Sequence, residues 1–363
     1  MIGKTLISCV GDAWVDRRYR YCTRCRRGMA GFDAWAGLKR DSLTPRGRRM
    51  AVLAGSKMSF DASSDHLRDL CGLRISDQTI RRACDGVGRE AKAYLEESRV
   101  AVEAVAQVHG RQARECTMDG AKVNTVEGWR EIRGVVACRR EPGEPASVRQ
   151  WKKRNLPKPA ARLAWAAIAD SEQVGAKVQG MADRLGWDLG RGVSVLGDGI
   201  PWIWKQSRQH LPEHEGCLDI WHLMEHLHAA GRALYGEGDP AKRWAELQRA
   251  LIFRHGSMKY FKRRLAPQVN AHRRADPGGE KARALRSLLL YLWKHRGRMN
   301  YRDRLRRGLP IGSGQIEGVC KNTLNRRLRK NSPRWRPERA NHMAALCCLH
   351  TSNQWDPFWS KAA

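Results

Sequence analysis

Hydrophobic and polar residues follow two different periods along this chain. Short apolar runs predict five strands in the middle of the chain, at residues 116–123, 129–138, 163–169, 193–196 and 217–220. The first two strands flank a turn-prone segment that ends at Gly128, so we expect them to form a hairpin. With helices between the later strands, this order predicts an α/β fold with a mixed sheet and helices on its faces.

Helical periodicity dominates on both sides of the predicted sheet. Residues 60–73 and a segment capped by Ser76 predict two short helices, and Asp170 with Gln173 forms a capping-box pattern before a third. Residues 236–307 show helical spacing throughout and are densely basic. They predict an all-helical insertion that interrupts the α/β part of the chain.

The charge of the chain narrows its class of partner. The 68 Lys and Arg residues outnumber the 37 Asp and Glu residues, which gives a formal net charge of +31. This excess favours nucleic acid, or an anionic membrane surface, over a small metabolite. No apolar run approaches the roughly 18 residues of a membrane span, and the amino terminus lacks an export signal. We therefore expect a cytoplasmic protein without a membrane partner. The 11 cysteines are an odd number and are scattered along the chain, so we expect mostly free thiols.

One Cys-x-x-Cys pair lies in the weakly periodic, basic region of residues 1–55. Cys22 and Cys25 supply two thiolates where structural zinc normally takes four ligands, and Cys9 is a poor substitute for a second pair. Zinc binding by Cys22 and Cys25 is one interpretation, and a basic loop with two buried thiols is the other.

The two helices expected over residues 58–90 have the spacing of a helix-turn-helix. In that arrangement the DNA major groove would be faced by Gln78, Thr79, Arg81 and Arg82. A plain helical hairpin fits the same pattern, and both interpretations stay open.

Three acidic residues stand in small-residue settings at wide spacing. Asp119 and Asp198 each precede a glycine at the end of a predicted strand, and Glu317 lies in the first turn of a predicted helix. Three ionised carboxylates brought together would raise one another's pKa values, and two Mg²⁺ ions about 3.5–4 Å apart would relieve this repulsion. Taken singly, an Asp-Gly pair is more often a turn, so the hypothesis depends on the three together.

Four segments with unusual Trp, His and Gly positions support this hypothesis. They are Leu-Gly-Asp-Gly-Ile-Pro-Trp-Ile-Trp (196–204), Leu-Asp-Ile-Trp-His-Leu-Met-Glu-His (218–226), Gly-Ser-Gly-Gln-Ile-Glu-Gly-Val-Cys-Lys (312–321) and Arg334-Trp335. With these motifs in this order, the chain resembles the insertion-sequence DDE transposases of the ISKra type. The resemblance covers about the whole length of the chain. The resemblance implies a ribonuclease-H-like core, a mixed sheet with flanking helices, whose catalytic triad maps onto Asp119, Asp198 and Glu317.

The same resemblance implies cofactors and partners. Two Mg²⁺ or Mn²⁺ ions would be bound by the triad, and double-stranded DNA would be bound at the terminal inverted repeats of the element and at the target. Related transposases carry Asp-x-x-His after the second Asp, here Asp219 and His222, which we interpret as support for the active site. They also carry a second Cys-x-x-Cys upstream of Cys22, completing a Zn²⁺ site, so we expect a truncated amino terminus. Pairing of element ends implies a homo-oligomer, and the family implies a prokaryotic, nucleoid-associated protein.

On this resemblance the chain divides into five parts. They are a partial zinc-ribbon-like basic region (1–55), a helix-turn-helix-like DNA-binding region (56–110), the first part of the ribonuclease-H-like core (111–235), the helical insertion (236–307), and the last part of the core with the Glu317 helix and a basic tail (308–363). The tail would place cations beside the scissile phosphodiester. Its DNA-binding candidates are Lys321, Arg326, Arg327, Arg329, Arg334 and Trp335. Trp335 fits stacking on an unpaired base or packing in the core equally well.

Two other function classes fit parts of the sequence. A non-catalytic DNA-binding protein derived from a transposase would keep the positive charge, although it has no physical need for an intact triad. His222, Glu225 and His226 also match the inverted zinc-peptidase motif His-x-x-Glu-His, with both histidines on one helix face. A peptidase has no use for so much positive charge, so the transposase is the leading hypothesis.

Overall fold

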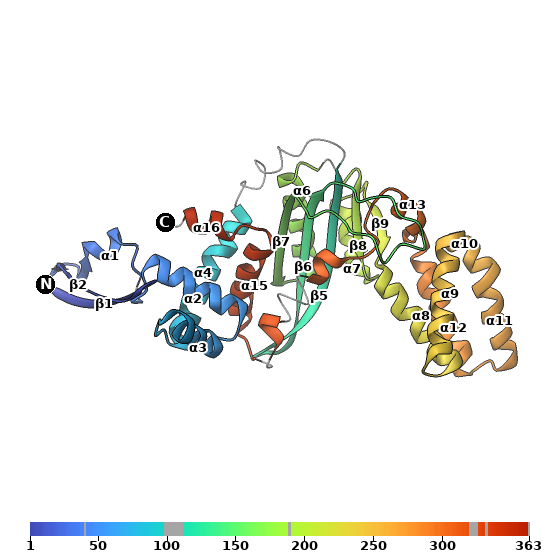
Figure 1. Cartoon of the computed structure of the whole chain (residues 1–363), viewed down its shortest axis with the longest axis horizontal. Coiled ribbons are helices and arrows are strands. Elements are labelled where there is room, and N and C mark those ends of the chain that lie inside the picture. Colours follow the sequence, from blue (N-terminus) through green and yellow to red (C-terminus); the bar gives the residue numbers. More distant parts are fainter. Residues whose placement is uncertain (40, 98–111, 188–189, 319–325, 331–332, 362–363) are drawn as a thin grey trace.

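A five-stranded sheet lies between two mainly helical parts of the chain in the computed structural model (Figure 1). The structure describes residues 1–39, 41–97, 112–187, 190–318, 326–330 and 333–361. The amino-terminal strands lie at one end of an elongated molecule, and the helical insertion lies at the other (Figure 1). The expected mixed α/β architecture is confirmed.

The amino-terminal region, which is weakly periodic in sequence, forms two small hairpins. The antiparallel pairs are β1 (Ile2–Ser8) with β2 (Gly11–Arg17), and β3 (Tyr19–Cys22) with β4 (Arg27–Ala30); α1 (Gly31–Trp35) follows. Most side chains of these strands are exposed or half-buried, so the sequence carries no clear apolar alternation here. Backbone pairing alone defines these strands.

Three helices of the amino-terminal half pack against one another. They are α2 (Pro45–Lys57), α3 (Phe60–Cys71) and α4 (Asp77–Glu97). The two helices expected here, α3 and α4, are confirmed. Gly72 ends α3 at φ 66°, and the Ser76 hydroxyl accepts the N–H of Thr79 at the start of α4.

The first of these helices was missed by the sequence analysis. Thr44 caps α2 by accepting the N–H of Gly47, and Pro45 occupies the first helical position. The helix spans the boundary that we placed between residues 55 and 56. It therefore joins the basic amino-terminal region to the helix-turn-helix-like region.

The sheet has the strand order β7-β6-β5-β8-β9. Its strands are β5 (Ala113–Thr125), β6 (Gly128–Arg140), β7 (Ala161–Ile168), β8 (Val193–Gly197) and β9 (Glu215–Leu218). β5, β6 and β7 are antiparallel, whereas β8 is parallel to β5 and β9 is parallel to β8. All five predicted strands are present, and Gly128 in the β5–β6 turn has φ 99°, which favours glycine.

Helices cover both faces of the sheet. α6 (Ser171–Arg184) and α7 (Pro201–His210) pack on one face, and α15 (Pro337–Thr351) packs on the other, followed by α16 (Trp355–Lys361). Along β6, Val135 joins the core under α6 and Val136 joins the core under α15, as the two-residue period of a strand requires. The predicted capping box of α6 is present, because Asp170 and Gln173 exchange hydrogen bonds.

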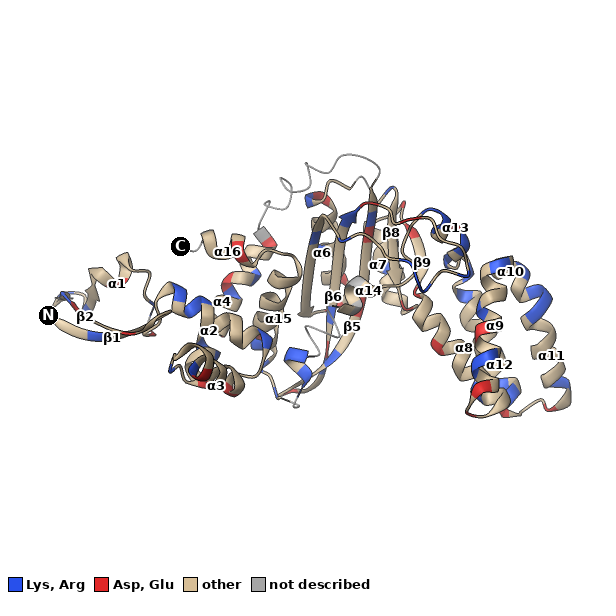
Figure 2. Ribbon diagram, viewed as in Figure 1, with Lys and Arg blue, Asp and Glu red and all other residues tan. Residues whose placement is uncertain are grey.

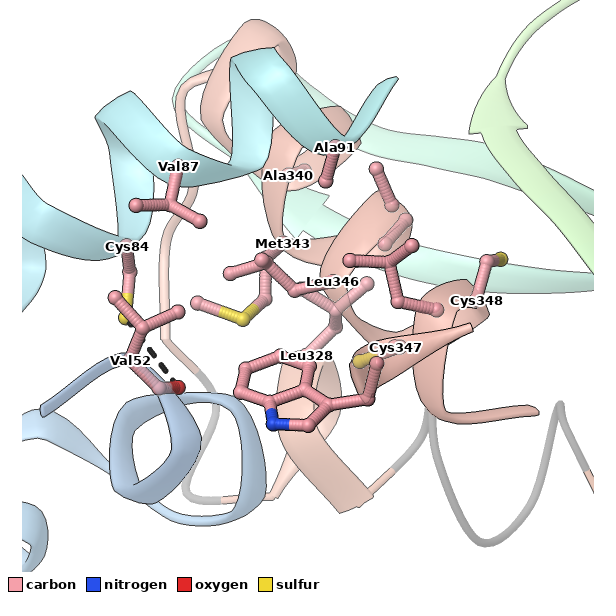
Figure 3. Close-up of a cluster of buried hydrophobic side chains, with 14 of the residues drawn as sticks. Val52, Cys84, Val87, Ala91, Leu328, Ala340, Met343, Leu346, Cys347 and Cys348 are labelled. Carbon is pink, nitrogen blue, oxygen red and sulfur yellow. Dashed lines mark hydrogen bonds between the residues drawn. The ribbon is translucent and has the colours of Figure 1, made fainter. Parts of the chain in front are cut away.

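The core under α15 continues into the amino-terminal helices. Figure 3 shows one buried cluster that contains Val52 of α2, Cys84 of α4, Met343 of α15 and Leu328, which precedes α15. α15 packs directly along α4, so the two ends of the chain stabilise the same face of the sheet. Truncating these side chains would destabilise both regions together.

The segment after β9 is helical, as predicted. Its elements are α8 (Ile220–Tyr235), α9 (Asp239–His255), α10 (Ser257–Tyr260), a π-helical turn η1 (Phe261–Leu265), α11 (Ala266–Ala275), α12 (Glu280–Lys294), a 3₁₀ turn η2 (Arg296–Arg298), α13 (Tyr301–Arg306) and α14 (Gly314–Glu317). Leu285, Leu288 and Leu292 are buried in a separate core that also contains Leu218 of β9. The insertion is therefore packed against the edge of the sheet.

Candidate active site

Asp198 follows the last residue of β8, as expected, whereas Asp119 lies in the middle of β5, so its expected place at the end of a strand was wrong. The last paired residues of β5 and β8 are Thr117 and Leu196, and two further residues along each strand lead to Asp119 and Asp198. Parallel neighbours lie about 4.8 Å apart, and residues in register project from the same face. The sheet thus brings the first two predicted acidic residues to one edge.

Asp198 sits in a tight, half-buried loop after β8. Its Oδ1 accepts the N–H of Ile200 at 3.0 Å, and its backbone carbonyl accepts the hydroxyl of Tyr291 at 3.0 Å. Gly199 follows with φ 99°, and a Cβ there would come within 2.9 Å of His295 Nε2. This loop therefore requires glycine at position 199.

The charge state of Asp198 is set mainly by its partial burial. Burial raises the pKa of its carboxyl above the usual range, and the nearby Asp219 adds to this effect. The Ile200 N–H and His222 oppose the rise. A divalent cation beside Asp198 would lower its pKa again.

Asp119 is half-buried on β5 and lies beside the helix that carries Glu317. Its Oδ1 accepts the N–H of Gly120 at 2.7 Å, and its partner across the β5–β6 pairing is Gly134. A Cβ at Gly134 would lie 3.3 Å from Ile316 Cδ1 of α14. The short α14 thus packs over the sheet beside Asp119, while the side chain of Glu317 lies outside what the structure describes.

Asp219 holds two segments together beside this edge. It follows β9 as Asp198 follows β8, and its N–H donates to the carbonyl of Gly197 at 2.8 Å. Its Oδ1 caps α8 by accepting the N–H of Trp221 at 2.6 Å, and its Oδ2 accepts both the N–H and the hydroxyl of Ser313. Asp219 is 1 % exposed, in keeping with its predicted supporting position.

The histidines of the expected peptidase motif are arranged differently from a zinc site. His222 Nδ1 lies 3.1 Å from Glu225 Oε2, whereas the His226 ring stacks on Tyr291 with centroids 3.6 Å apart. Burial lowers the pKa of His226, which keeps its ring neutral at pH 7. Both histidines belong to the surroundings of Asp198.

Tyr291 and His295 of the helical insertion were missed as site residues. Both reach Asp198 or Gly199 from α12 and the residue after it, and burial lowers the pKa of His295 to about 4. The sequence separation is 93 residues for the Tyr291 hydrogen bond, and no local motif marks it. The contact of the helical insertion with the Asp198 loop could only be recognised from the three-dimensional structure.

Within the part of the chain that the structure describes, no group of three or more His, Cys, Asp or Glu residues is placed to hold a metal ion. Asp119 and Asp198 are two carboxylates of the expected triad, and the described residues do not include the third carboxylate.

The amino-terminal cysteines lie on an exposed hairpin. Cys22 ends β3 and both Cys22 and Cys25 are exposed, so the alternative with two buried thiols was wrong. Hydrogen bonds from the Cys25 backbone and side chain and the Arg24 backbone lower the pKa of the Cys22 thiol. The two thiols share a turn, and zinc binding by them stays a prediction.

The predicted groove-facing residues lie on the first turns of α4. Gln78 and Arg82 are exposed, and Thr79 and Arg81 are half-buried. Lys and Arg recur over the whole molecule, from α2 to the α9–α12 arm (Figure 2). These residues are accessible to a partner, and their contact with DNA stays a prediction.

The basic tail is only partly a surface. Arg326, Arg329 and Arg334 are exposed, and Lys321 lies outside the described residues. Arg327, expected to contact DNA along an exposed helix, is 6 % exposed, and its Nε donates to the carbonyl of Gly55. Its placement on an outer face was wrong, because a contact distant in sequence draws the side chain inward.

Trp335 packs in the core. It is 8 % exposed, its Nε1 donates to the carbonyl of Leu328 at 3.1 Å, and its ring meets Phe60 edge-on. Of its two interpretations, core packing is confirmed, and stacking on a base is not available to this buried ring.

No family model matches this chain, and no curated protein matches it significantly. In the described part of the chain, no helix is both long and apolar enough to cross a bilayer. Any functional conclusion therefore depends on the site itself.

Proposed function

We propose that this chain is a DNA transposase of the DDE type with a ribonuclease-H-like core. The observation that carries the proposal is the parallel register of β5 and β8. It places Asp119, in the middle of β5, and Asp198, just after β8, each two residues beyond the last paired residues Thr117 and Leu196. The helix that contains Glu317 packs on β5 and β6 beside them. This arrangement agrees with the triad that the ISKra-type resemblance implies.

The residues at this edge fit a divalent metal site. Carboxylate oxygens are the ligands that Mg²⁺ and Mn²⁺ prefer. Burial raises the pKa of Asp198, and a bound cation would offset this cost of ionisation. Asp119, Asp198 and Glu317 would hold two ions. Bound there, the ions would activate water and stabilise the leaving oxygen of a phosphodiester.

The reaction consists of two in-line displacements at phosphorus. Water attacks a phosphodiester at the element end, the P–O3′ bond breaks, and a free 3′-hydroxyl is released. That hydroxyl then attacks a phosphodiester of the target, forming a new P–O3′ bond and releasing a target 3′-hydroxyl. Double-stranded DNA is the substrate in both steps, and pairing of two ends calls for a homo-oligomer in the prokaryotic cytoplasm.

Strand cleavage at a matching DNA end tests this proposal. Labelled duplexes would carry inverted repeats found in the DNA that flanks the gene, and nicking in Mg²⁺ would be compared with EDTA. Asp198→Asn should abolish nicking while DNA binding persists. Asp183→Asn is the matched control, because Asp183 is exposed on α6, away from the site.

The possible results separate the proposal from its rivals. Nicking by the parent and by Asp183→Asn, but not by Asp198→Asn, supports the transposase. Binding without nicking by every variant would favour the non-catalytic DNA-binding protein. Equal nicking by the parent and Asp198→Asn would contradict the assignment of the site.

A further inference from the structure

A basic cavity lies where α3, the tip of the β5–β6 hairpin and the carboxyl-terminal segment meet. Its volume is about 740 Å³. Eight of its lining residues are Lys or Arg, and two, Asp61 and Asp77, are acidic. A cavity of this size with such an excess of cations suits an extended anion better than an apolar ligand.

Hydrogen bonds between distant segments hold the cavity wall in place. The backbone N–H of Trp335 donates to the carbonyl of Asn124 at 3.0 Å, and the backbone carbonyl of Trp335 accepts the N–H of Val126 at 2.9 Å. Arg327 Nε donates to the carbonyl of Gly55 in α2 at 2.6 Å. The amino-terminal helices, the hairpin and the carboxyl-terminal segment are thereby fixed around one space.

Arg327 is a buried cation at the wall of this cavity. Its guanidinium lies 4.4 Å from the centre of the Phe60 ring and 5.1 Å from that of Trp335. The Nη2 atom is buried and has no hydrogen-bond partner among the described residues. A buried guanidinium with an unused donor is costly, and an anion in the cavity would supply the missing acceptor.

Asp61, the acidic group whose charge acts on Arg327, is held by other donors. Asp61 accepts hydrogen bonds from the Ser59 hydroxyl and the Ala62 N–H, which lower the pKa of its carboxyl. Arg326, Lys330 and Arg334 add further positive charge along the same wall. Arg339 is paired with Asp85 at 3.6 Å, and the other cations of the wall still outnumber its acidic side chains Asp61 and Asp77.

We propose that this cavity binds phosphodiester groups of the DNA backbone. Arg81 belongs both to the cavity wall and to the first turns of α4, so the cavity continues the surface that we expect to face DNA. Backbone contacts here would set the position of the duplex while α4 contacts base edges. The DNA source of the phosphate rests on the proposed function, whereas the anion site itself rests on the cavity.

Salt-dependent DNA binding in EDTA tests this inference without strand cleavage. The affinity for a short random-sequence duplex would be measured at several salt concentrations with the full chain. The paired substitution Arg326→Gln with Arg334→Gln removes two exposed wall cations, and Arg327→Lys keeps the buried charge but loses the guanidinium fork. Arg273→Gln with Arg274→Gln is the matched control, because these exposed arginines of α11 lie outside the cavity wall and outside the helix-turn-helix-like region.

We expect the paired cavity variant to lower the slope of log affinity against log salt by about one unit for each lost phosphate contact. The control pair should keep the parent slope, and Arg327→Lys should weaken binding while its thermal melting stays cooperative. An unchanged slope in the paired cavity variant, or an equal loss in the control pair, would overturn the inference. Inorganic phosphate, followed by its effect on melting temperature, identifies the source: stabilisation by phosphate with an unchanged DNA slope would replace DNA by a free anion.

Failure of this inference and failure of the proposed function are distinguishable. Asp198→Asn should bind the duplex with the parent slope, since Asp198 is not part of the cavity. A cavity effect on binding without any nicking would leave the anion site standing and remove the transposase. Nicking without a cavity effect would do the reverse.

Discussion

The carboxylate of Asp219 joins the start of α8 to Ser313. One oxygen caps the helix, and the other accepts the N–H and the hydroxyl of Ser313, 94 residues later in the chain. Ser313 immediately precedes α14, the helix that contains Glu317. A buried carboxylate thus connects the strand edge that carries Asp198 to the segment that carries the third acidic residue.

Removing the Ser313 hydroxyl should impair both stability and cleavage. Ser313→Ala leaves the buried Asp219 carboxylate with one donor fewer, which should cost about 1.5–3 kcal/mol of unfolding free energy. Nicking should fall further than this, because the segment that leads into α14 loses one of its two hydrogen bonds to Asp219. Chemical denaturation and the nicking assay would measure the two effects.

Ser352→Ala is the matched control for Ser313→Ala. The Ser352 hydroxyl accepts the N–H of Ala164 on β7, away from the carboxylates, and Ser352 is also buried. It should lose stability without a specific loss of nicking. Equal effects of both substitutions on nicking would show that Ser313 matters for folding alone.

The local part of this arrangement could be predicted from the sequence, and the distant part could not. The strand that delivers Asp198, the capping box of Asp170 and the turn at Gly128 depend on neighbouring residues, so their patterns are visible in the sequence. That Asp119 and Asp198 come together was a prediction that depended on the fold, because no local pattern determines the register of β5 and β8. The Ser313 anchor of Asp219 has no local signature at all.

The two main errors have different physical origins. Arg327 looks like one more exposed cation in a basic run, yet its guanidinium is drawn inward by the carbonyl of Gly55, 272 residues away. The helix α2 was missed although Thr44 and Pro45 form a helix-start signal, because its basic residues obscured the apolar positions Ala51 and Val52. A distant contact decided the first case, whereas the second had a local signal in the sequence.

Asp198→Asn should stabilise the protein at neutral pH when no metal is present. Because burial raises the pKa of Asp198 in the folded state, folding favours its protonated form. That contribution is fully present below the unfolded pKa of about 3.9 and is lost as the pH rises through the higher folded pKa. The parent should therefore melt below Asp198→Asn at pH 7 in EDTA, and the difference should vanish in acid.

Adding Mn²⁺ should reverse this order. The ion stabilises the ionised carboxylate of the parent and has less to bind in Asp198→Asn. Thermal melting with and without Mn²⁺ at fixed pH measures the shift, with Asp183→Asn as the control that should follow the parent. An identical Mn²⁺ shift in the parent and Asp198→Asn would contradict metal binding at this edge.

Tyr291→Phe should slow cleavage without disturbing the insertion. The change removes the hydroxyl that donates to the Asp198 carbonyl, while the ring can still stack on His226. Loss of one such hydrogen bond is worth about 0.5–1.5 kcal/mol, so we expect nicking to fall by roughly two- to tenfold. Single-turnover nicking at saturating protein would measure it.

Tyr260→Phe provides a matched control in the same insertion. Its hydroxyl donates to Gln248 Oε1 at 3.0 Å inside the helical core, distant from Asp198 in its contacts. It should lower stability by a similar amount and leave nicking unchanged. If both variants slow nicking equally, the insertion supports the site only through its overall stability.

Gln78→Ala should relax the sequence preference of DNA binding. Gln78 is exposed on the first turn of α4, where a side chain can pair with a base edge in the major groove. Loss of such a pair reduces discrimination at one base position by about 1–3 kcal/mol and leaves the salt dependence nearly unchanged. Competition between the element end and single-base variants of it measures this discrimination.

The cavity variant Arg326→Gln with Arg334→Gln should behave in the opposite way, since backbone contacts carry charge but no base sequence. A loss of salt dependence in Gln78→Ala with unchanged discrimination would assign α4 to the backbone and leave the helix-turn-helix interpretation without support.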